Sequence, residues 1–109
     1  MINTIESLEY YENAIEKHDA VLFYFSHEEC NVCKVLKPKV DELLTNDFPE
    51  MKMYYCDTKN LPELAAQNSI FAVPTILVYF GTKESIRKSR NIGLQELNDL
   101  ITRPYEMIF

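Results

Sequence analysis

The chain has 109 residues, of which 47% are hydrophobic, and 17 acidic against 11 basic residues give it a net charge of −6. This length suits one compact core and is too short for two ordinary domains, so we expect a single domain over residues 1–109. The negative charge disfavours nucleic-acid binding, which needs a basic surface. The basic cluster from Lys83 to Arg90 is instead typical of a charged, exposed edge strand.

Membrane insertion is also disfavoured by the sequence. No segment approaches the roughly 20 apolar residues that a spanning helix requires, and the N-terminus lacks a basic region followed by an apolar stretch. We therefore expect a cytoplasmic location and no membrane contact. Because structural disulfides are rare in the cytosol, closely spaced cysteines there are more often catalytic or metal-binding than stabilising.

The first half of the chain predicts alternating strands and helices. Ile2–Ile5 can form a short strand, and Ser7 is a plausible N-cap for a helix with an apolar face. A second strand covers about Ala20 to Phe25. The next helix continues to about Leu44 and contains Pro38, which removes one backbone hydrogen bond.

The second strand and its helix are joined by the motif Cys30-Asn31-Val32-Cys33. At the start of a helix, unpaired N–H groups and the helix dipole favour an anion, and so favour the thiolate of Cys30. Cys33 lies one turn further in and is expected to be less exposed. Two such thiols can close reversibly into a disulfide, so that Cys30 attacks a substrate disulfide and Cys33 resolves the mixed disulfide.

Two other interpretations of the cysteine pair remain open at this point. The pair can be half of a zinc site, or two inert helix residues. Zinc normally takes four ligands, and the remaining candidates Cys56, His18 and His27 form no second paired motif, so we expect no metal. Cys56 itself is either a regulatory thiol or, as free cysteines often are, a small buried hydrophobe.

The second half of the chain continues the alternation. The expected elements are a strand, a short helix begun by Pro62, an apolar strand, a polar edge strand after a turn at Gly81, and a last helix after Gly93 that ends at Pro104. The three strands are expected over Met51–Cys56, Thr75–Phe80 and Glu84–Lys88, and the short helix that Pro62 begins continues over Glu63–Asn68. The tail Tyr105–Phe109 either packs back on the domain or offers a contact. The order predicts an α/β fold with a central mixed sheet of about five strands, covered by helices on both faces.

With this order in place, the chain resembles the thioredoxin family over nearly its whole length. The cysteine motif and Lys34 follow the second strand, Pro38 lies in the helix behind it, and Val73-Pro74-Thr75 precedes the fourth strand. The resemblance implies a thioredoxin fold and a thiol–disulfide oxidoreductase that reduces protein disulfides through Cys30 and Cys33. It also implies that Pro74 is cis and that Val73, Pro74 and Thr75 hold an extended substrate segment by main-chain pairing.

Several residues depart from the family pattern and are expected to modulate the site. Glu28 and Glu29 oppose ionisation of the neighbouring Cys30, whereas a protonated His27 favours it, and Lys34 directly follows the motif. The family's aromatic residue beside the nucleophile is missing. Tyr24 stands where thioredoxins carry a buried aspartate, and Met53 stands about where they carry its lysine partner. Since tyrosine is a poor base at neutral pH, we expect slow resolution.

The resemblance also implies partners for the chain. Its substrate is a disulfide-containing protein or a small thiol compound, its electrons come from a flavin-dependent NADPH reductase, and it acts as a monomer with no bound cofactor. A different class of function is a binding module that recognises one partner by strand addition, with regulatory or vestigial cysteines. Loss of Cys33 separates the two, because an oxidoreductase then accumulates mixed disulfides.

Overall fold

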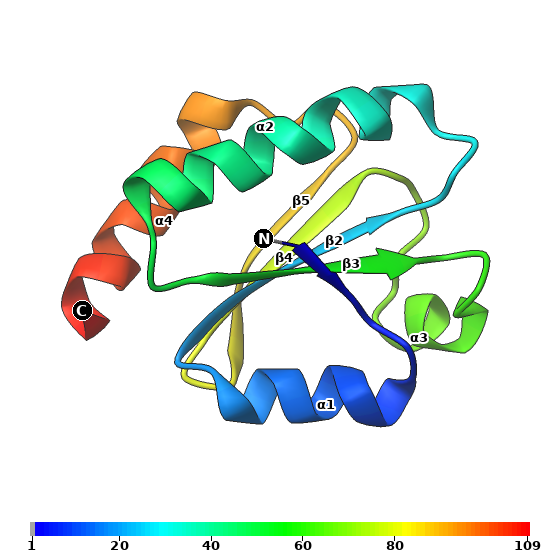
Figure 1. Cartoon of the computed structure of the whole chain (residues 1–109), viewed down its shortest axis with the longest axis horizontal. Helices are drawn as coiled ribbons and strands as arrows, with labels where there is room; N and C mark the ends of the chain where they lie inside the picture. The colour runs from blue at the N-terminus through cyan, green and yellow to red at the C-terminus, as the bar shows by residue number, and fades with distance from the viewer. Residues whose placement is uncertain (1) are drawn as a thin grey trace.

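The computed structural model describes residues 2–109 as strands and helices that alternate along the chain (Figure 1). In order they are β1 (Ile2–Thr4), α1 (Leu8–Lys17), β2 (Ala20–Ser26), α2 (Asn31–Asp47), β3 (Lys52–Asp57), α3 (Pro62–Gln67), β4 (Thr75–Phe80), β5 (Lys83–Ser89) and α4 (Leu94–Ile108). Within these residues no helix combines the length and the apolar character needed to cross a membrane.

The strands form one mixed sheet in the order β1-β3-β2-β4-β5. Strands β1, β3 and β2 run parallel, whereas β4 pairs antiparallel with both β2 and β5. All seven residues of β2 are buried, as expected for a central strand that is covered on both faces. The predicted five-stranded mixed sheet is therefore confirmed, and β2 brings the cysteine motif to the middle of one end of the sheet.

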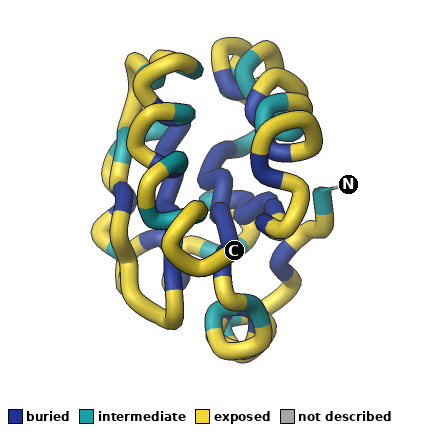
Figure 2. Tube along the Cα trace, turned by 90° about the vertical axis from the view of Figure 1, so that its left-hand side faces the viewer, coloured by how far each residue is buried: buried dark blue, intermediate teal, exposed yellow. Residues whose placement is uncertain are grey.

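Alternation along β2 divides the core into two layers. Leu22 and Tyr24 belong to the cluster under α2 and α4, whereas Val21, Phe23 and Phe25 belong to the cluster over α1 and α3. Figure 1 shows these helix pairs on opposite sides of the sheet, and Figure 2 shows burial concentrated in the strands between them. Alternate residues of β2 therefore point toward α2, the helix that carries the cysteines, and the residues between them point away from it.

Several predicted boundaries are confirmed by local hydrogen bonds and dihedral angles. Ser7 caps α1, where its Oγ accepts the N–H of Tyr10 at 3.1 Å. Gly81 and Thr82 have φ of +58° and +70°, and such a pair of left-handed residues is what the favoured two-residue hairpin turn requires. Helix α2 extends past the predicted end at Leu44 to Asp47, because no proline or glycine occurs between Leu44 and Pro49.

The prediction that the last helix ends at Pro104 is wrong, because α4 continues to Ile108. Proline cannot donate the usual backbone hydrogen bond, but the turn that follows is held by tertiary contacts. The Tyr105 ring packs against Phe48 with 5.1 Å between ring centroids, and its hydroxyl accepts the N–H of Glu50 at 3.1 Å. The tail therefore packs back on the domain as a helical turn.

We predict that Tyr105→Ala lowers the free energy of unfolding by about 2 kcal/mol, the sum of a lost aromatic pair of ~1 kcal/mol and a lost hydrogen bond of ~1 kcal/mol. Urea denaturation followed by far-UV circular dichroism measures this change. Met107, whose side chain is 80% exposed in the same turn, supplies the control, since Met107→Ala should shift stability by less than ~0.5 kcal/mol. Equal stability of the two variants would show that Tyr105 does not anchor the last turn.

Candidate active site

The two cysteines of the motif lie at the N-terminus of α2 and are joined by a disulfide, with their Cα atoms 5.3 Å apart. Cys30 is the N-cap residue, and its Sγ accepts the N–H of Cys33 at 3.2 Å. Cys33 is only 1% exposed, whereas Cys30 is partly exposed. The helix start therefore presents one sulfur to solvent and keeps the other inside, as the motif predicted.

No negatively charged side chain in the first turn of α2 destabilises a thiolate at Cys30. The first turn of α2 contains no acidic residue, so the positive end of the helix dipole acts on the Cys30 sulfur. Glu29 precedes it but is exposed and forms an ion pair with Lys59. Glu28 is exposed as well. The two carboxylates that sequence reasoning set against Cys30 are thus solvated, and one of them is paired.

Tyr24 lies in β2 directly beneath the motif and is fully buried. Its hydroxyl donates a hydrogen bond to the Cys33 carbonyl oxygen at 2.8 Å. Burial raises the pKa of Tyr24 well above its ordinary value, so the phenol stays protonated and remains a donor. Met53 of β3 belongs to the same apolar cluster. Tyr24, which we expected to be a poor base, therefore has a structural role as a hydrogen-bond donor to the backbone of α2.

A cavity of about 190 Å³ opens beside Cys33. Its polar lining includes His27, Glu28 and Lys37, together with Tyr55 from β3. The Lys37 Nζ lies 3.9 Å from the centre of the Tyr55 ring, and burial is the main cause that raises the pKa of Tyr55 to about 12. The Nδ1 atom of His27 is buried and has no hydrogen-bond partner among the described residues.

The segment Val73-Pro74-Thr75 lies just before β4, and its Val73–Pro74 peptide bond is cis. The Pro74 carbonyl accepts the N–H of Arg90 at 2.7 Å, and the Thr75 hydroxyl donates to the Ala72 carbonyl at 2.6 Å. Within residues 2–109 the backbone of Val73 makes no hydrogen bond. An unpaired backbone group at the start of a strand is available to a further strand.

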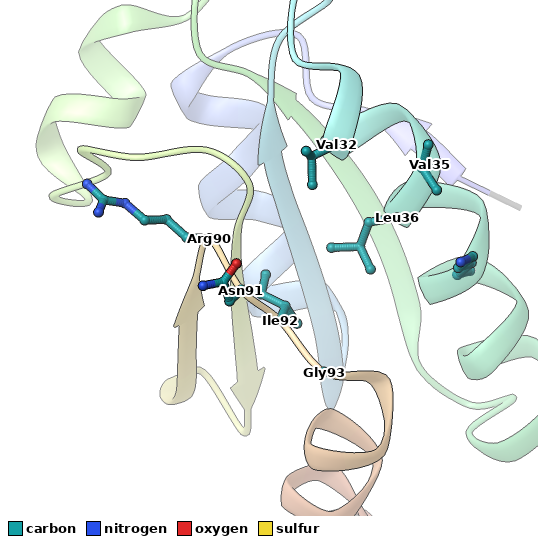
Figure 3. A pocket seen from close by; sticks show the side chains of 8 residues that line it. Val32, Val35, Leu36, Arg90, Asn91, Ile92 and Gly93 are labelled. Atoms are coloured by element: carbon teal, nitrogen blue, oxygen red, sulfur yellow. The ribbon is translucent and has the colours of Figure 1, made fainter.

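Sequence reasoning missed a groove that begins next to the motif (Figure 3). It has a volume of about 600 Å³ and runs between α2 and the segment 90–93. Val32 and Val35 of α2 are 65% and 60% exposed on its wall, although apolar residues at helical spacing usually form a buried face. Phe71, two residues before Val73, is 88% exposed. The sequence did contain one signal for a contact surface here, because Phe71 is a large aromatic residue in the loop before β4.

The remaining candidate ligands and thiols lie away from the motif. Cys56 is 1% exposed and belongs to the core cluster on the opposite face of the sheet from Cys33. Burial raises the pKa of its thiol, which makes it inert, so the interpretation of Cys56 as a buried hydrophobe holds. Among the described residues, no three His, Cys, Asp or Glu side chains are grouped as metal ligands would be.

Comparison with known proteins agrees with this geometry. Residues 3–103 match the family model described as Thioredoxin. The chain is 27% identical over 103 residues to the thioredoxin-like protein YdfQ of Bacillus subtilis, which covers 94% of this chain and 91% of that protein. It is 33% identical over 81 residues to a thioredoxin of Chlamydia trachomatis, with 74% and 76% of the two chains covered.

Solved structures give the same result. The X-ray structure of Fasciola hepatica thioredoxin superposes with a TM-score of 0.83 at 26% identity, over 93% of this chain and 97% of that one. The residues that match the family model include the whole of α2, the helix that carries the cysteine pair. The Cys30–Cys33 disulfide lies at the start of that helix. In a chain that matches the Thioredoxin family model over residues 3–103, this cysteine pair is the redox group. The chain therefore belongs to the thioredoxin family and is a thiol–disulfide oxidoreductase.

Proposed function

We propose that this oxidoreductase reduces protein disulfides, with Cys30 as nucleophile and Cys33 as resolving thiol. The difference in exposure between the two sulfurs at the helix start supports this assignment above all. The Cys30 thiolate attacks a substrate disulfide, forming a mixed disulfide and releasing one substrate thiolate. Cys33 then attacks Cys30, which forms the intramolecular disulfide and releases the second substrate thiolate, so that two electrons pass to the substrate.

The substrate segment is proposed to lie across Val73, Pro74 and Thr75. The unpaired Val73 backbone offers main-chain hydrogen bonds, and Thr75 is held in place through Ala72. Apolar substrate side chains then contact the groove lined by Val32 and Val35 on one side. Phe71 is exposed and contributes an aromatic contact. This contact replaces that of the aromatic residue that the family usually carries beside the nucleophile and this chain lacks.

Five residues around the motif are proposed to tune these steps. Tyr24 fixes the first turn of α2 through the Cys33 carbonyl, and Glu29 is balanced by Lys59. His27, Glu28 and Lys34 line the cavity beside Cys33 and set its electrostatic potential. Because Tyr24 stands beneath the helix where thioredoxins carry a buried aspartate, resolution is expected to be slower than in a thioredoxin with that aspartate.

The proposal extends to the cellular setting of the reaction. Electrons come from a flavin-dependent NADPH reductase, and the substrate is a disulfide-containing protein or a small thiol compound. The chain works in the cytoplasm as a single-domain monomer without a bound cofactor, since the cysteine pair itself carries the two electrons.

The redox couple can be tested by equilibrating the protein in thiol–disulfide buffers, alkylating free thiols and counting labels by mass spectrometry. We expect a reversible two-electron transition at Cys30 and Cys33, at a midpoint nearer the reducing than the oxidising end of the family range of about −270 to −120 mV. Cys56→Ala should leave the midpoint unchanged, because Cys56 is buried on the other face. A pair that never reopens at these potentials would contradict the proposal.

Replacing the resolving residue separates the oxidoreductase from the binding module. We predict that Cys33→Ser accumulates reductant-sensitive mixed disulfides with cellular proteins, because the first attack still occurs and the second cannot. The double variant Cys30→Ser with Cys33→Ser is the matched control and should trap none. Partners that bind the double variant equally well and elute without reductant would instead support recognition by strand addition alone.

The role of Phe71 is tested by Phe71→Ala. In an assay that follows reduction of a protein disulfide by this chain, we expect KM to rise about three- to tenfold, as a lost contact of ~1 kcal/mol implies. The rate with glutathione disulfide, which is too small to need the Phe71 contact, should change less than twofold. Met107→Ala is the control for a remote exposed apolar residue. Equal effects on the large and the small substrate would contradict a docking role.

A further inference from the structure

We infer that His27 accepts the proton of the Cys33 thiol in the resolving step. The inference rests on the proposed roles of Cys30 and Cys33 and assigns a positioned base to that step. Three observations carry it: Tyr24 and Met53 beneath α2 offer no base, His27 lines the same cavity as Cys33, and its Nδ1 is buried with no hydrogen-bond partner among the described residues.

The step needs a base because only the thiolate is nucleophilic. In the mixed disulfide, Cys33 is a thiol with its side chain inside the protein, where burial disfavours its charged form. The proton passes from Cys33 Sγ to His27 Nδ1, and the Cys33 thiolate attacks Cys30 Sγ. The Cys30–Cys33 bond forms as the bond from Cys30 to the substrate sulfur breaks. The substrate thiolate leaves with the electron pair, and the imidazolium returns its proton to solvent.

The sheet beneath Cys33 does not supply this base. Tyr24 is the nearest polar residue, but its phenol is a donor to the Cys33 carbonyl, and burial holds it protonated. Met53 is apolar, and Tyr55 stays protonated at neutral pH because burial raises its pKa to about 12. Cys56 faces the opposite layer of the core. Asp57 at the end of β3 is a buried carboxylate, but its Oδ1 already accepts the N–H groups of Lys59 and Asn60. This leaves the cavity beside Cys33 as the route for the proton.

His27 is held at the wall of that cavity by its backbone. Its carbonyl accepts the N–H of Cys30 at 3.2 Å and the Ser26 hydroxyl at 3.3 Å. The Ser26 carbonyl in turn accepts the N–H of Thr58 at 2.8 Å. This clamp fixes the residue relative to the motif while its Nδ1 remains unpaired and shielded from solvent. Buried nitrogen atoms without a partner are uncommon, and a neutral imidazole nitrogen in this state can take up a proton.

Charged groups face this pair from three elements. The loop before α2 contributes Glu28, whereas its neighbour Glu29 is paired with Lys59 beyond β3. Helix α2 contributes Lys34 and Lys37, and β3 ends at Asp57, whose Oδ1 accepts the N–H groups of Lys59 and Asn60. Charges of both signs therefore line the cavity, with Glu28 opposite to Lys34 and Lys37 in sign. Carboxylates, which ordinarily titrate near 4.3, accept a thiol proton less readily than imidazoles, which titrate near 6.5.

The test is a single-turnover reaction of the reduced protein with one equivalent of dithiobis(nitrobenzoate), followed by stopped-flow absorbance. Attack by Cys30 releases the first nitrothiobenzoate, and resolution by Cys33 releases the second. We expect His27→Gln to change the first release by less than about threefold and to slow the second about 10- to 30-fold near pH 7, where an unassisted thiol of pKa ~8.5 is only ~3% ionised. The difference should shrink steadily as the pH rises above about 8.5, because more of the thiol then ionises unaided, and free imidazole should restore part of the lost rate.

His18→Gln is the matched control, because it removes the other histidine, which lies on the opposite face with its Nε2 2.8 Å from the Tyr54 hydroxyl. A second release in His27→Gln that matches the unaltered protein, or one slowed equally at every pH, would overturn the inference. So would Glu28→Gln slowing the second release as much as His27→Gln does. If the unaltered protein releases only one equivalent, the resolving role of Cys33 fails and this inference fails with it. Two equivalents at unaltered rates in His27→Gln would sink this inference alone.

Discussion

The hydrogen bond from the Tyr24 hydroxyl to the Cys33 carbonyl is the constraint on which the active site depends. It joins the most buried strand of the sheet to the first turn of α2, at 2.8 Å and without access to solvent. A buried phenol needs a partner, and here the partner is the backbone of the residue that carries the inner sulfur. The depth of Cys33 is thus set by the sheet, and Cys30 is left at the surface by the geometry of the helix start.

In this arrangement, the residue that positions α2 is not the residue that transfers a proton, although a single buried carboxylate can do both. Tyr24 positions the helix but cannot exchange a proton near neutral pH, because burial raises its pKa. Proton transfer therefore depends on groups that approach from the side, through the loop that contains His27. The same alternation of side chains sends Cys56 to the other layer, so the core that supports the redox pair contains no third thiol able to compete for it.

Most of the fold could be predicted from the sequence, because its signals are local. The apolar run of β2, the Ser7 cap, Pro62 at a helix start and Gly81 in a turn all act within a few residues. The failures came from contacts between distant segments. Pro104 does not end α4, since Tyr105 packs against Phe48 from another element. The outward placement of Val35, the pairing of Glu29 with Lys59 and the buried His27 nitrogen likewise depend on where loops meet in space.

The two edges of the sheet have a consequence for self-association. Strand β1 contains three residues, and β5 presents charged side chains, among them Arg87, which donates two hydrogen bonds to Glu84 at 2.8 and 2.9 Å. Short or charged edges discourage pairing between identical chains. The two edges of this sheet are thereby protected from adding further copies of the chain, which is how a sheet grows into a fibril.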